Sequence, residues 1–420
     1  MALVYIDDLV EGMVLAEDLL TPTGRFVLAA GAAIQADQLK LLKSWGVIEA
    51  NIDEASLDNA YVHQKVASEE YVARAESFLT ERFSLNALEQ EPVATLFRHA
   101  AHRLAVKFQK GRDVEALLPH TETSGASEVP PVAPLSATQL MNGSVELVSL
   151  PTVYTHIVEL LARANTSSHQ LAEVISKDAN LTVRLLRLAN SSFYGFSGKV
   201  DSVSRAISLL GNNELSTLVL GISVIRQFQN IPSEQVDMES FWKHSIRCAL
   251  FARILAEHLG EKDTEKYFTG GLLHDIGRLI MLNRMPQQYA LAVNRARTDK
   301  LPMYRAEQEC LKTDHTIIGK LMVEKWRLSP ALIRMIGYHH SPRLAHYSRE
   351  ACVVHIADMF AHACSDEILL VNEVPELQLQ AWVETGLSPE VIAPAMRQVD
   401  DEFKQIVGIF FDAEETVENE

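Results

Sequence analysis

Apolar residues recur every three to four positions through most of the chain, which is the spacing of an amphipathic helix. Residues 241–259 show the pattern clearly, with Phe241 and Leu255 on an apolar side and charged residues on or near the opposite side. Residues that begin helices agree with this spacing, because Ser329-Pro330 is an N-cap followed by a first-turn proline. The pattern predicts a mainly α-helical protein.

The first part of the chain departs from this pattern. Residues 1–55 predict a small α/β module in which residues 13–20 and 25–30 are strands and residues 36–45 are a helix that ends at a glycine. Helical periodicity returns in residues 56–110. We expect this part either to be a docking or sensing module or to be a cap that covers a helical surface.

A linker is predicted next, because residues 111–138 are rich in Pro, Ser, Thr, Glu and Ala. A larger helical domain is expected over residues 139–365, followed by a helical extension with an acidic tail over residues 366–420. The parts on either side of such a linker are expected to move relative to one another.

Composition narrows the possible functions. The 420 residues carry a formal net charge of -17, which disfavours nonspecific binding to nucleic acid because phosphate neutralisation needs clustered Lys and Arg. No apolar run reaches about 18 residues and no signal peptide is evident, so a cytoplasmic protein without a membrane span is expected. The four cysteines are scattered, which argues against a disulfide framework.

Two carboxylates lie in segments that otherwise have the composition of a core. Asp275 follows His274 within the apolar run 271–280, and Asp358 shares a helix face with small apolar residues such as Ala351. A buried carboxylate is costly unless it is paired or bound to a metal. Both acids therefore need partners, and the adjacent imidazole indicates which kind.

Histidines on other predicted helices are candidates for these partners. His244, His315 and His339 fall on apolar faces, whereas His258, His346 and His362 are expected to be solvated. A single inward histidine is usually a hydrogen-bonded core residue. Several helices that each place an imidazole or carboxylate inside the protein instead favour one convergent polar site, with or without a metal.

The order of these residues resembles the HD metal-dependent phosphohydrolase superfamily, in which an early His, a His-Asp pair and a late Asp bind a metal. By this resemblance the metal ligands are His244, His274, Asp275 and Asp358, with His315, His339 and His340 as further candidates. Histidine-rich ligation favours iron, manganese or zinc over magnesium.

The segment upstream of these residues narrows the resemblance. Residues 175–182, 185–191 and 203–211 are similar to the HDOD family, the HD-related output domain of bacterial signalling proteins, and the similarity extends from about residue 145 to about 365. HDOD domains are helical and are generally regarded as outputs that bind partner proteins. Asn190, Tyr194 and Gly195 belong to the motif, where they either shape the ends of helices or mark a surface for a ligand or partner.

The resemblance leaves catalysis open. HD-GYP phosphodiesterases carry a Gly-Tyr-Pro motif after their His-His pair, and this chain has Ser341-Pro342-Arg343 there. Their usual lysine is replaced by Arg278, and the two residues are not interchangeable.

Three functions therefore remain. The favoured one is a bacterial signalling output or adaptor protein that acts by binding signalling proteins or a ligand and not by catalysis. The alternative is a metal-dependent phosphohydrolase of a nucleotide, in which Asp275 and Arg278 take part in the reaction. In the third, the same pocket binds a nucleotide that it does not cleave.

Overall fold

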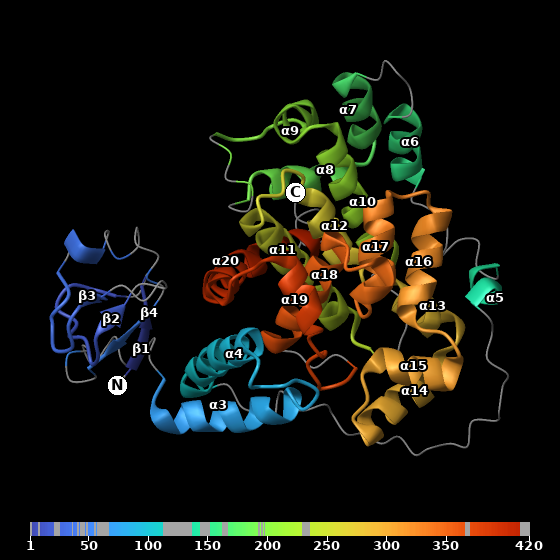
Figure 1. Cartoon of the computed structure of the whole chain (residues 1–420). Helices are drawn as coiled ribbons and strands as arrows, with labels where there is room; N and C mark the ends of the chain where they lie inside the picture. Colours follow the sequence, from blue (N-terminus) through green and yellow to red (C-terminus); the bar gives the residue numbers. More distant parts are fainter. Residues whose placement is uncertain are drawn as a thin grey trace. The chain divides into compact units, whose positions relative to one another are not determined.

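The computed structural model describes most of the chain, and the fold is given for these residues alone. They are residues 2–6, 9–20, 26–35, 37–39, 42, 47, 49–53, 56, 67–111, 137–142, 152–161, 167–191, 194, 196, 198–228, 236–365 and 370–411. Within them, strands occur only near the N-terminus and the other regular elements are helices (Figure 1). The predicted fold class, mainly α with a small strand-containing module, is confirmed.

The chain divides into two compact units, residues 1–118 with 388–394 and residues 119–387 with 395–420. Most of the segment predicted as a linker, residues 112–136, lies outside the described residues.

The strands belong to the first unit and are short. They are β1 (Ala2–Tyr5), β2 (Leu19–Leu20), β3 (Phe26–Leu28) and β4 (Glu49–Ile52). β1 pairs with β4 and β2 with β3, both antiparallel. Side chains such as Met13, Leu15, Ile34 and Ile52 are buried between them. The expected strands at residues 13–20 and 25–30 therefore have only short paired cores, and the outer pair β1–β4 was not expected.

Helices complete the first unit. α3 (Glu69–Arg82) packs along α4 (Glu91–Gln109), and the rings of Phe78 and Phe108 meet edge to face at 6.4 Å between centroids. The short helix η4 (Pro389–Val391) packs against α4. Both long helices bury one apolar stripe, as their sequence period predicts.

The second unit begins with helices that pack mainly on one another. They are α5 (Ala137–Asn142), α6 (Thr152–Leu161), α7 (Ser168–Ser176), α8 (Ala179–Ala189), α9 (Val203–Leu210) and α10 (Asn212–Phe228). Local sequence sets their boundaries: Ser167 and Gln170 form a capping box for α7, and Asp178 caps α8. α10 contacts α6, α8 and α9 and also packs against α12 (Glu265–Leu273).

The helices that follow begin with α11 (Met238–His258), which is buried along most of its length. After α12 come α13 (Ile276–Arg284), α14 (Pro286–Asp299), α15 (Met303–Leu311), α16 (His315–Lys325), α17 (Pro330–Tyr338), the short helix η3 (Pro342–Ala345), α18 (Arg349–Ala363), α19 (Leu379–Thr385) and α20 (Ile392–Phe411). α11 packs against α12 and α18, α12 and α18 both pack against α17, and α13 packs against α16 (Figure 1). The polar residues predicted to lie inside the protein come from these helices.

Two glycines allow the helices around α12 and α13 to approach closely. A Cβ at Gly271 would lie 2.8 Å from the Cα of Ala249 on α11, and a Cβ at Gly277 would lie 2.0 Å from the carbonyl oxygen of His315. Both neighbours are backbone atoms, which cannot rotate away. These glycines therefore set the spacing between the helices that flank His274.

A hydrogen bond ties the segment after α8 to α12. The Tyr194 hydroxyl donates to Oε2 of Glu265 at 2.8 Å, and Nε of Arg253 lies 3.4 Å from Oε1 of the same carboxyl group. Glu265 is buried. Burial raises the pKa of Glu265 to about 7, although Arg253 and Tyr194 act in the opposite direction.

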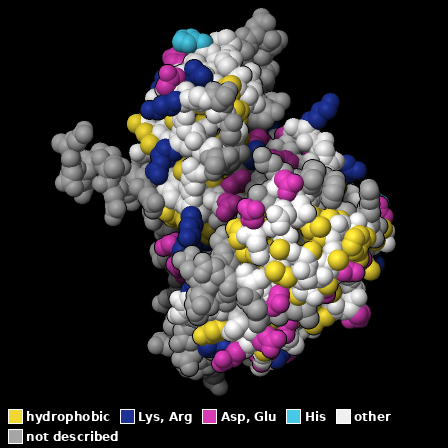
Figure 2. Space-filling view, turned by 90° about the vertical axis from the view of Figure 1, so that its left-hand side faces the viewer, with side chains coloured by type: hydrophobic (Ala, Val, Ile, Leu, Met, Phe, Trp, Pro, Cys, Tyr) yellow, Lys and Arg dark blue, Asp and Glu magenta, His cyan; other side chains and the backbone are white. Residues whose placement is uncertain are grey.

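Surface properties of the described residues agree with the composition. No helix among them combines the length and the apolar character needed to cross a lipid bilayer. On the face drawn in Figure 2, acidic side chains lie among apolar and basic ones.

We expect the substitution Gly277→Ala to destabilise the second unit strongly. The added methyl group would overlap the backbone of His315, and overpacking of this kind costs about 1–3 kcal/mol or more. The matched control is Gly337→Ala, where the new methyl group would meet only the Lys320 side chain, at 3.0 Å. Urea unfolding measures both; equal losses of unfolding free energy would contradict the assigned approach of α13 to α16.

Stability should also depend on the protonation of Glu265. Its pKa is about 7 in the folded protein and 4.5 when unperturbed, so folding retains a proton that the unfolded chain loses earlier. This contribution to the free energy of unfolding is fully present below about pH 4.5. It falls as the pH rises and is lost above about pH 7. Across that range it amounts to at most about 3 kcal/mol. Unfolding at pH 5 and pH 8 should show a smaller decline in Glu265→Gln than in the unsubstituted protein, and identical declines would refute the assignment.

Candidate metal centre

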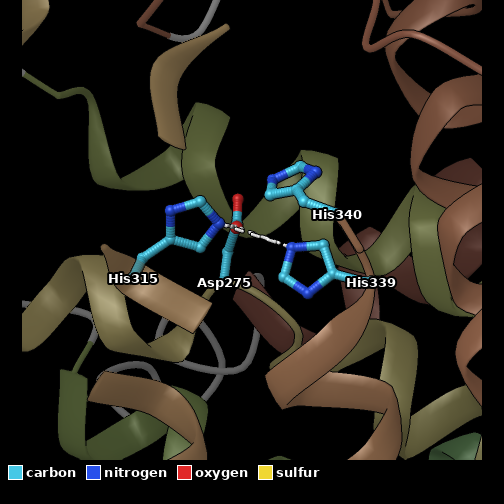
Figure 3. Close-up of side chains that lie close together, drawn as sticks. All are labelled: Asp275, His315, His339 and His340. Carbon is cyan, nitrogen blue, oxygen red and sulfur yellow. Dashed lines mark hydrogen bonds and ion pairs between the residues drawn. The ribbon is translucent and has the colours of Figure 1, made fainter. Parts of the chain in front are cut away.

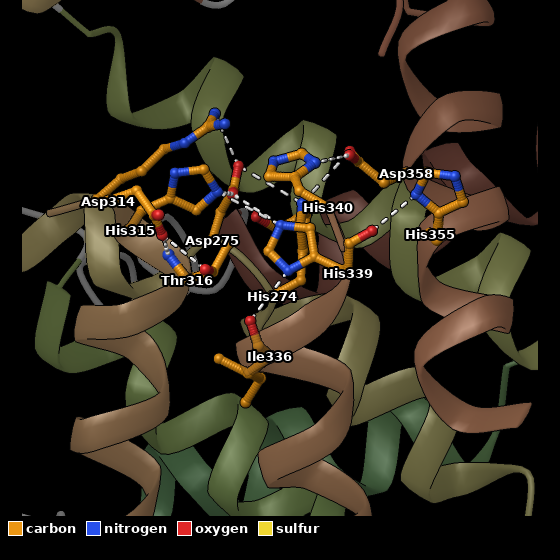
Figure 4. A network of polar contacts seen from close by, with 12 residues as sticks. His274, Asp275, Asp314, His315, Thr316, Ile336, His339, His340, His355 and Asp358 are labelled. Carbon is orange, nitrogen blue, oxygen red and sulfur yellow. Dashed lines mark hydrogen bonds and ion pairs between the residues drawn. The ribbon is translucent and has the colours of Figure 1, made fainter. Parts of the chain in front are cut away.

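The seven side chains predicted as metal ligands lie together in one buried cluster, which we call the His-Asp cluster. All of them except His244 are labelled in Figure 4, and four appear in Figure 3. Its members come from six positions: His244 on α11, His274 at the end of α12, Asp275 at the start of α13, His315 at the start of α16, His339 and His340 at the end of α17, and Asp358 on α18. Four of the six positions are helix ends, so short turns rather than helix faces aim most of these groups.

Asp358 organises one half of the cluster. Its Oδ1 lies 3.1 Å from Nε2 of His244 and 3.4 Å from Nε2 of His274, and these two nitrogens are 3.3 Å apart. Nδ1 of His340 lies 3.9 Å from Oδ2 of Asp358.

Asp275 connects this half to the other. Its Oδ2 lies 3.4 Å from Nε2 of His274, and its Oδ1 lies 3.2 Å from Nε2 of His315 and 3.8 Å from Nε2 of His339 (Figure 3). One potential ligand atom from each of Asp275, His315, His339 and His340 can be chosen so that all lie within 4.8 Å of one another. Asp275 also belongs to a second such group with His244 and His274. The geometry therefore offers two adjacent ion positions that share Asp275.

Hydrogen bonds fix the orientation of three imidazoles. Nδ1 of His274 lies 2.6 Å from the carbonyl oxygen of Gly271, and Nδ1 of His339 lies 3.0 Å from that of Ile336 (Figure 4). Because a carbonyl oxygen can only accept, Nδ1 carries the proton in both rings. Nε2 is then directed at the centre of the cluster, which is the arrangement that metal-bound histidines use.

Glu307 plays the same part for the third imidazole, and sequence reasoning missed it. Its Oε2 lies 2.6 Å from Nδ1 of His315 and accepts the His315 backbone N–H at 2.9 Å. Tyr289 donates its hydroxyl to the other oxygen at 3.1 Å. The available signal was a glutamate on the same face of α15 as Met303 and Leu311, which are buried.

His362 was also missed, because we expected it to be solvated. It is 6% exposed, and its Nε2 lies 3.5 Å from Oδ1 of Asp358, four residues earlier on α18. Cys248, one turn after His244, is likewise buried near His274 and Asp358. The i, i+4 spacing from an identified ligand is the signal that could have found both.

The carboxylates remain ionised despite their burial. Burial alone would raise the pKa of Asp275, but Arg278, His274 and His315 hold it well below its usual range. Burial would likewise raise the pKa of Asp358, which His362, His244 and His274 hold well below its usual value.

The imidazoles differ from one another. Burial, with the neighbouring His274 and His315, lowers the pKa of His339 to about 3, and burial lowers the pKa of His340 as well. His274 is the opposite case, because Asp275 raises its pKa above the usual value against the effect of burial. Neutral imidazoles and charged carboxylates are the forms that bind metals.

The donor set fits a metal ion. Three buried carboxylate oxygens, both of Asp275 and Oδ1 of Asp358, accept no hydrogen bond from the described residues. Charged groups nevertheless surround all three oxygens. Buried carboxylate oxygens are normally hydrogen-bonded or bound to metals. Imidazole nitrogens combined with carboxylates suit zinc, iron or manganese.

Arg278 lies at the edge of the cluster. Its Nη1 is 2.8 Å from Oδ2 of Asp275, three residues earlier, and Nε is 4.0 Å from Oε1 of Glu307. Arg278 thus already neutralises the carboxylate that joins the two halves. The contact with Asp275 uses one nitrogen of the guanidinium group, which has further N–H donors.

A cavity of about 260 Å³ adjoins the cluster at His340. Tyr304, Thr316, Lys320 and Tyr338 also line it, and Nζ of Lys320 donates to the Tyr338 hydroxyl at 2.8 Å. The Tyr304 ring stacks on His340 with 4.9 Å between centroids. His340 is therefore the cluster residue that separates the polar centre from this cavity.

The motif residues predicted to bind a ligand or partner lie outside the His-Asp cluster. The side chain of Asn190 donates to the carbonyl oxygen of Val200 and accepts its N–H, both at 2.7 Å, so it holds two chain segments together. Tyr194 is bonded to Glu265. Gly195 lies outside the described residues.

Comparison with known proteins places this geometry in a family. Residues 147–342 match the model of the HDOD domain. An uncharacterised protein of Treponema pallidum is 23% identical over 198 residues, which are 47% of this chain and 38% of that protein. The chain therefore spans well under half of the length of this relative.

Crystal structures similar to the chain include the following two. A proposed phosphohydrolase from Shewanella amazonensis is 25% identical, with a TM-score of 0.51 over 64% of this chain and 99% of that one. An HDOD domain protein of unknown function from Geobacter sulfurreducens is 22% identical, with a TM-score of 0.53 over 66% of this chain and 97% of that one. The suspected family is confirmed: residues 147–342 of this chain form an HDOD domain.

Proposed function

We propose that this protein is a bacterial, cytoplasmic signalling output protein whose HDOD domain acts by binding partner proteins rather than by catalysis. In this proposal the His-Asp cluster holds iron, manganese or zinc as a structural centre. One ion is held by His244, His274 and Asp275, with Asp358 beside them, and a second ion is held by His315, His339 and His340 together with the shared Asp275. The bound metal would supply positive charge between the carboxylates and so join the helices that carry them.

The closure of the cluster carries this proposal. Asp275 is 1% exposed, His315 and His339 are 0% exposed, and Asp358 is 2% exposed. A substrate must reach the metal and an attacking water for metal-assisted hydrolysis. Open coordination positions distinguish catalytic from structural metal sites, and this centre is enclosed by its own protein ligands.

A second function, metal-dependent hydrolysis of a nucleotide phosphate, is favoured by the cavity beside His340. Lys320 and Tyr338 line that cavity together with His340, and a displacement of the His340 side chain would connect it to the cluster. The similarity to the proposed phosphohydrolase from Shewanella amazonensis supports the same alternative. In that case Arg278 would bind the phosphate and Asp275 would hold the metal.

The metal is the first quantity to measure. We expect the purified, untagged protein to contain iron, manganese or zinc near a stoichiometric amount. The reason is that the cluster contains carboxylate oxygens that accept no hydrogen bond from the described residues. Asp275→Asn should lose most of the metal, since it removes the charge that both halves share. Asp401→Ala, which removes an exposed carboxylate, should retain it.

Elemental analysis with circular dichroism as a folding check decides this. Metal-free protein in both the unsubstituted and the Asp401→Ala forms would contradict the structural-centre proposal. A folded Asp275→Asn variant that keeps its metal would contradict the assigned ligand set.

Turnover distinguishes the two functions. The metal-loaded protein should hydrolyse bis(p-nitrophenyl) phosphate no faster than Asp275→Asn, because the centre is closed. Release of p-nitrophenolate gives the rate. A clear rate that disappears in both Asp275→Asn and Arg278→Gln but persists in Asp401→Ala would establish the hydrolase alternative and overturn the adaptor proposal.

A further inference from the structure

A second cavity lies in the helices that precede the His-Asp cluster in the chain. It has a volume of about 360 Å³ and is lined by side chains from α6, α8 and α10. None of its lining residues belongs to the cluster. We call it the α8–α10 cavity.

The charges of the α8–α10 cavity favour an anion. Arg184 and Arg226 line it together with one acid, Asp178, so its charged side chains sum to +1 in a chain with a net charge of -17. Arg184 is only 5% exposed, which means that its guanidinium group is held in a largely protein-enclosed environment. An enclosed cation interacts more strongly with an anion than a fully solvated one does.

Asp178 is already committed to other groups. Its Oδ1 accepts the backbone N–H of Leu181 at 3.0 Å, and its Oδ2 pairs with Nη1 of Arg226 at 2.6 Å. The acid therefore fixes Arg226 at the wall of the cavity by one nitrogen. A guanidinium group has further N–H donors, which can form a charge-assisted pair with a carboxylate or phosphate.

The remaining walls combine apolar surface with polar groups. Val153, Leu181 and Ile222 supply the apolar part, while Asn180 and Gln227 supply amide groups that can both donate and accept. A cavity of this size with mainly apolar walls and a few placed polar groups is typical of a site for a small organic ligand.

We propose that the α8–α10 cavity binds a small organic anion, a phosphate monoester or carboxylate carried on a compact apolar body. Arg184 and Arg226 bind the anionic group, and the apolar side chains contact the body. The proposal also assigns a role to part of the HDOD-like block, because Asp178, Asn180 and Leu181 lie in residues 175–182 and take no part in the His-Asp cluster.

Isothermal titration calorimetry of the full chain tests this with phenyl phosphate and benzoate, and with phenol as the neutral analogue. We expect one site per chain for phenyl phosphate, for benzoate or for both, and no binding of phenol. The pair of anions identifies whether phosphate or carboxylate is preferred. The absence of measurable binding of both anions at millimolar concentration would overturn the proposal.

Variants locate the binding. Arg226→Gln should weaken binding about tenfold or more, since it removes a charge-assisted contact. Ser223→Leu, which fills the cavity without changing charge, should abolish binding. The matched control Lys177→Gln removes a charge one residue before Asp178, where the side chain is exposed and pairs with Glu173, and should bind as before.

The same titration in Asp275→Asn separates this cavity from the His-Asp cluster, and affinity is expected to be unchanged there. Loss of binding in Asp275→Asn with retention in Arg226→Gln would place the anion at the cluster and overturn the proposal. Equal weakening by Lys177→Gln and Arg226→Gln would also overturn it, because it would indicate attraction to surface charge alone.

Discussion

The burial of the Asp275 carboxylate is the constraint on which the second unit depends. Removing an ionised group from water costs several kcal/mol unless opposite charge and hydrogen-bond donors replace the water. Here Arg278 supplies opposite charge 2.8 Å from Oδ2 of Asp275, and Nε2 of His274 and of His315 lie within 3.4 Å of its oxygens. His315 is in turn held by Glu307, and Glu307 by Tyr289. A change at one helix therefore alters the solvation of a charge that other helices share.

The cluster also contains its own balance of charge. Asp275 and Asp358 remain ionised, Asp275 raises the pKa of His274, and Arg278 is permanently charged. An imidazolium at His274 lies between the two carboxylates, 3.4 Å from each. Protonation of His274 and occupation by a metal are therefore competing ways to neutralise the same pair of acids.

Sequence reasoning identified most of the cluster because acids and imidazoles stand out in apolar helical runs. Asp275 and Asp358 were found this way, and the family resemblance added the order of the histidines. Glu307 and His362 escaped because a polar residue on a helix is ordinarily solvated, and only the packing of α15 and α18 encloses them. The β1–β4 pair escaped for a different reason: it joins Ala2 to Ile52, and local periodicity contains no information about such distant pairing.

Helix α10 lines the α8–α10 cavity and also packs against α12, which ends at the His-Asp cluster. Ile222 and Ser223 line the α8–α10 cavity, while the adjacent Gly221 faces α12, where a Cβ would lie 2.7 Å from Cδ2 of Leu272. Leu272 is two residues before His274. Helix α10 thus packs on α12, the helix that ends at the imidazole between the two carboxylates. The α8–α10 cavity and the His-Asp cluster are therefore two separate sites within one packed unit.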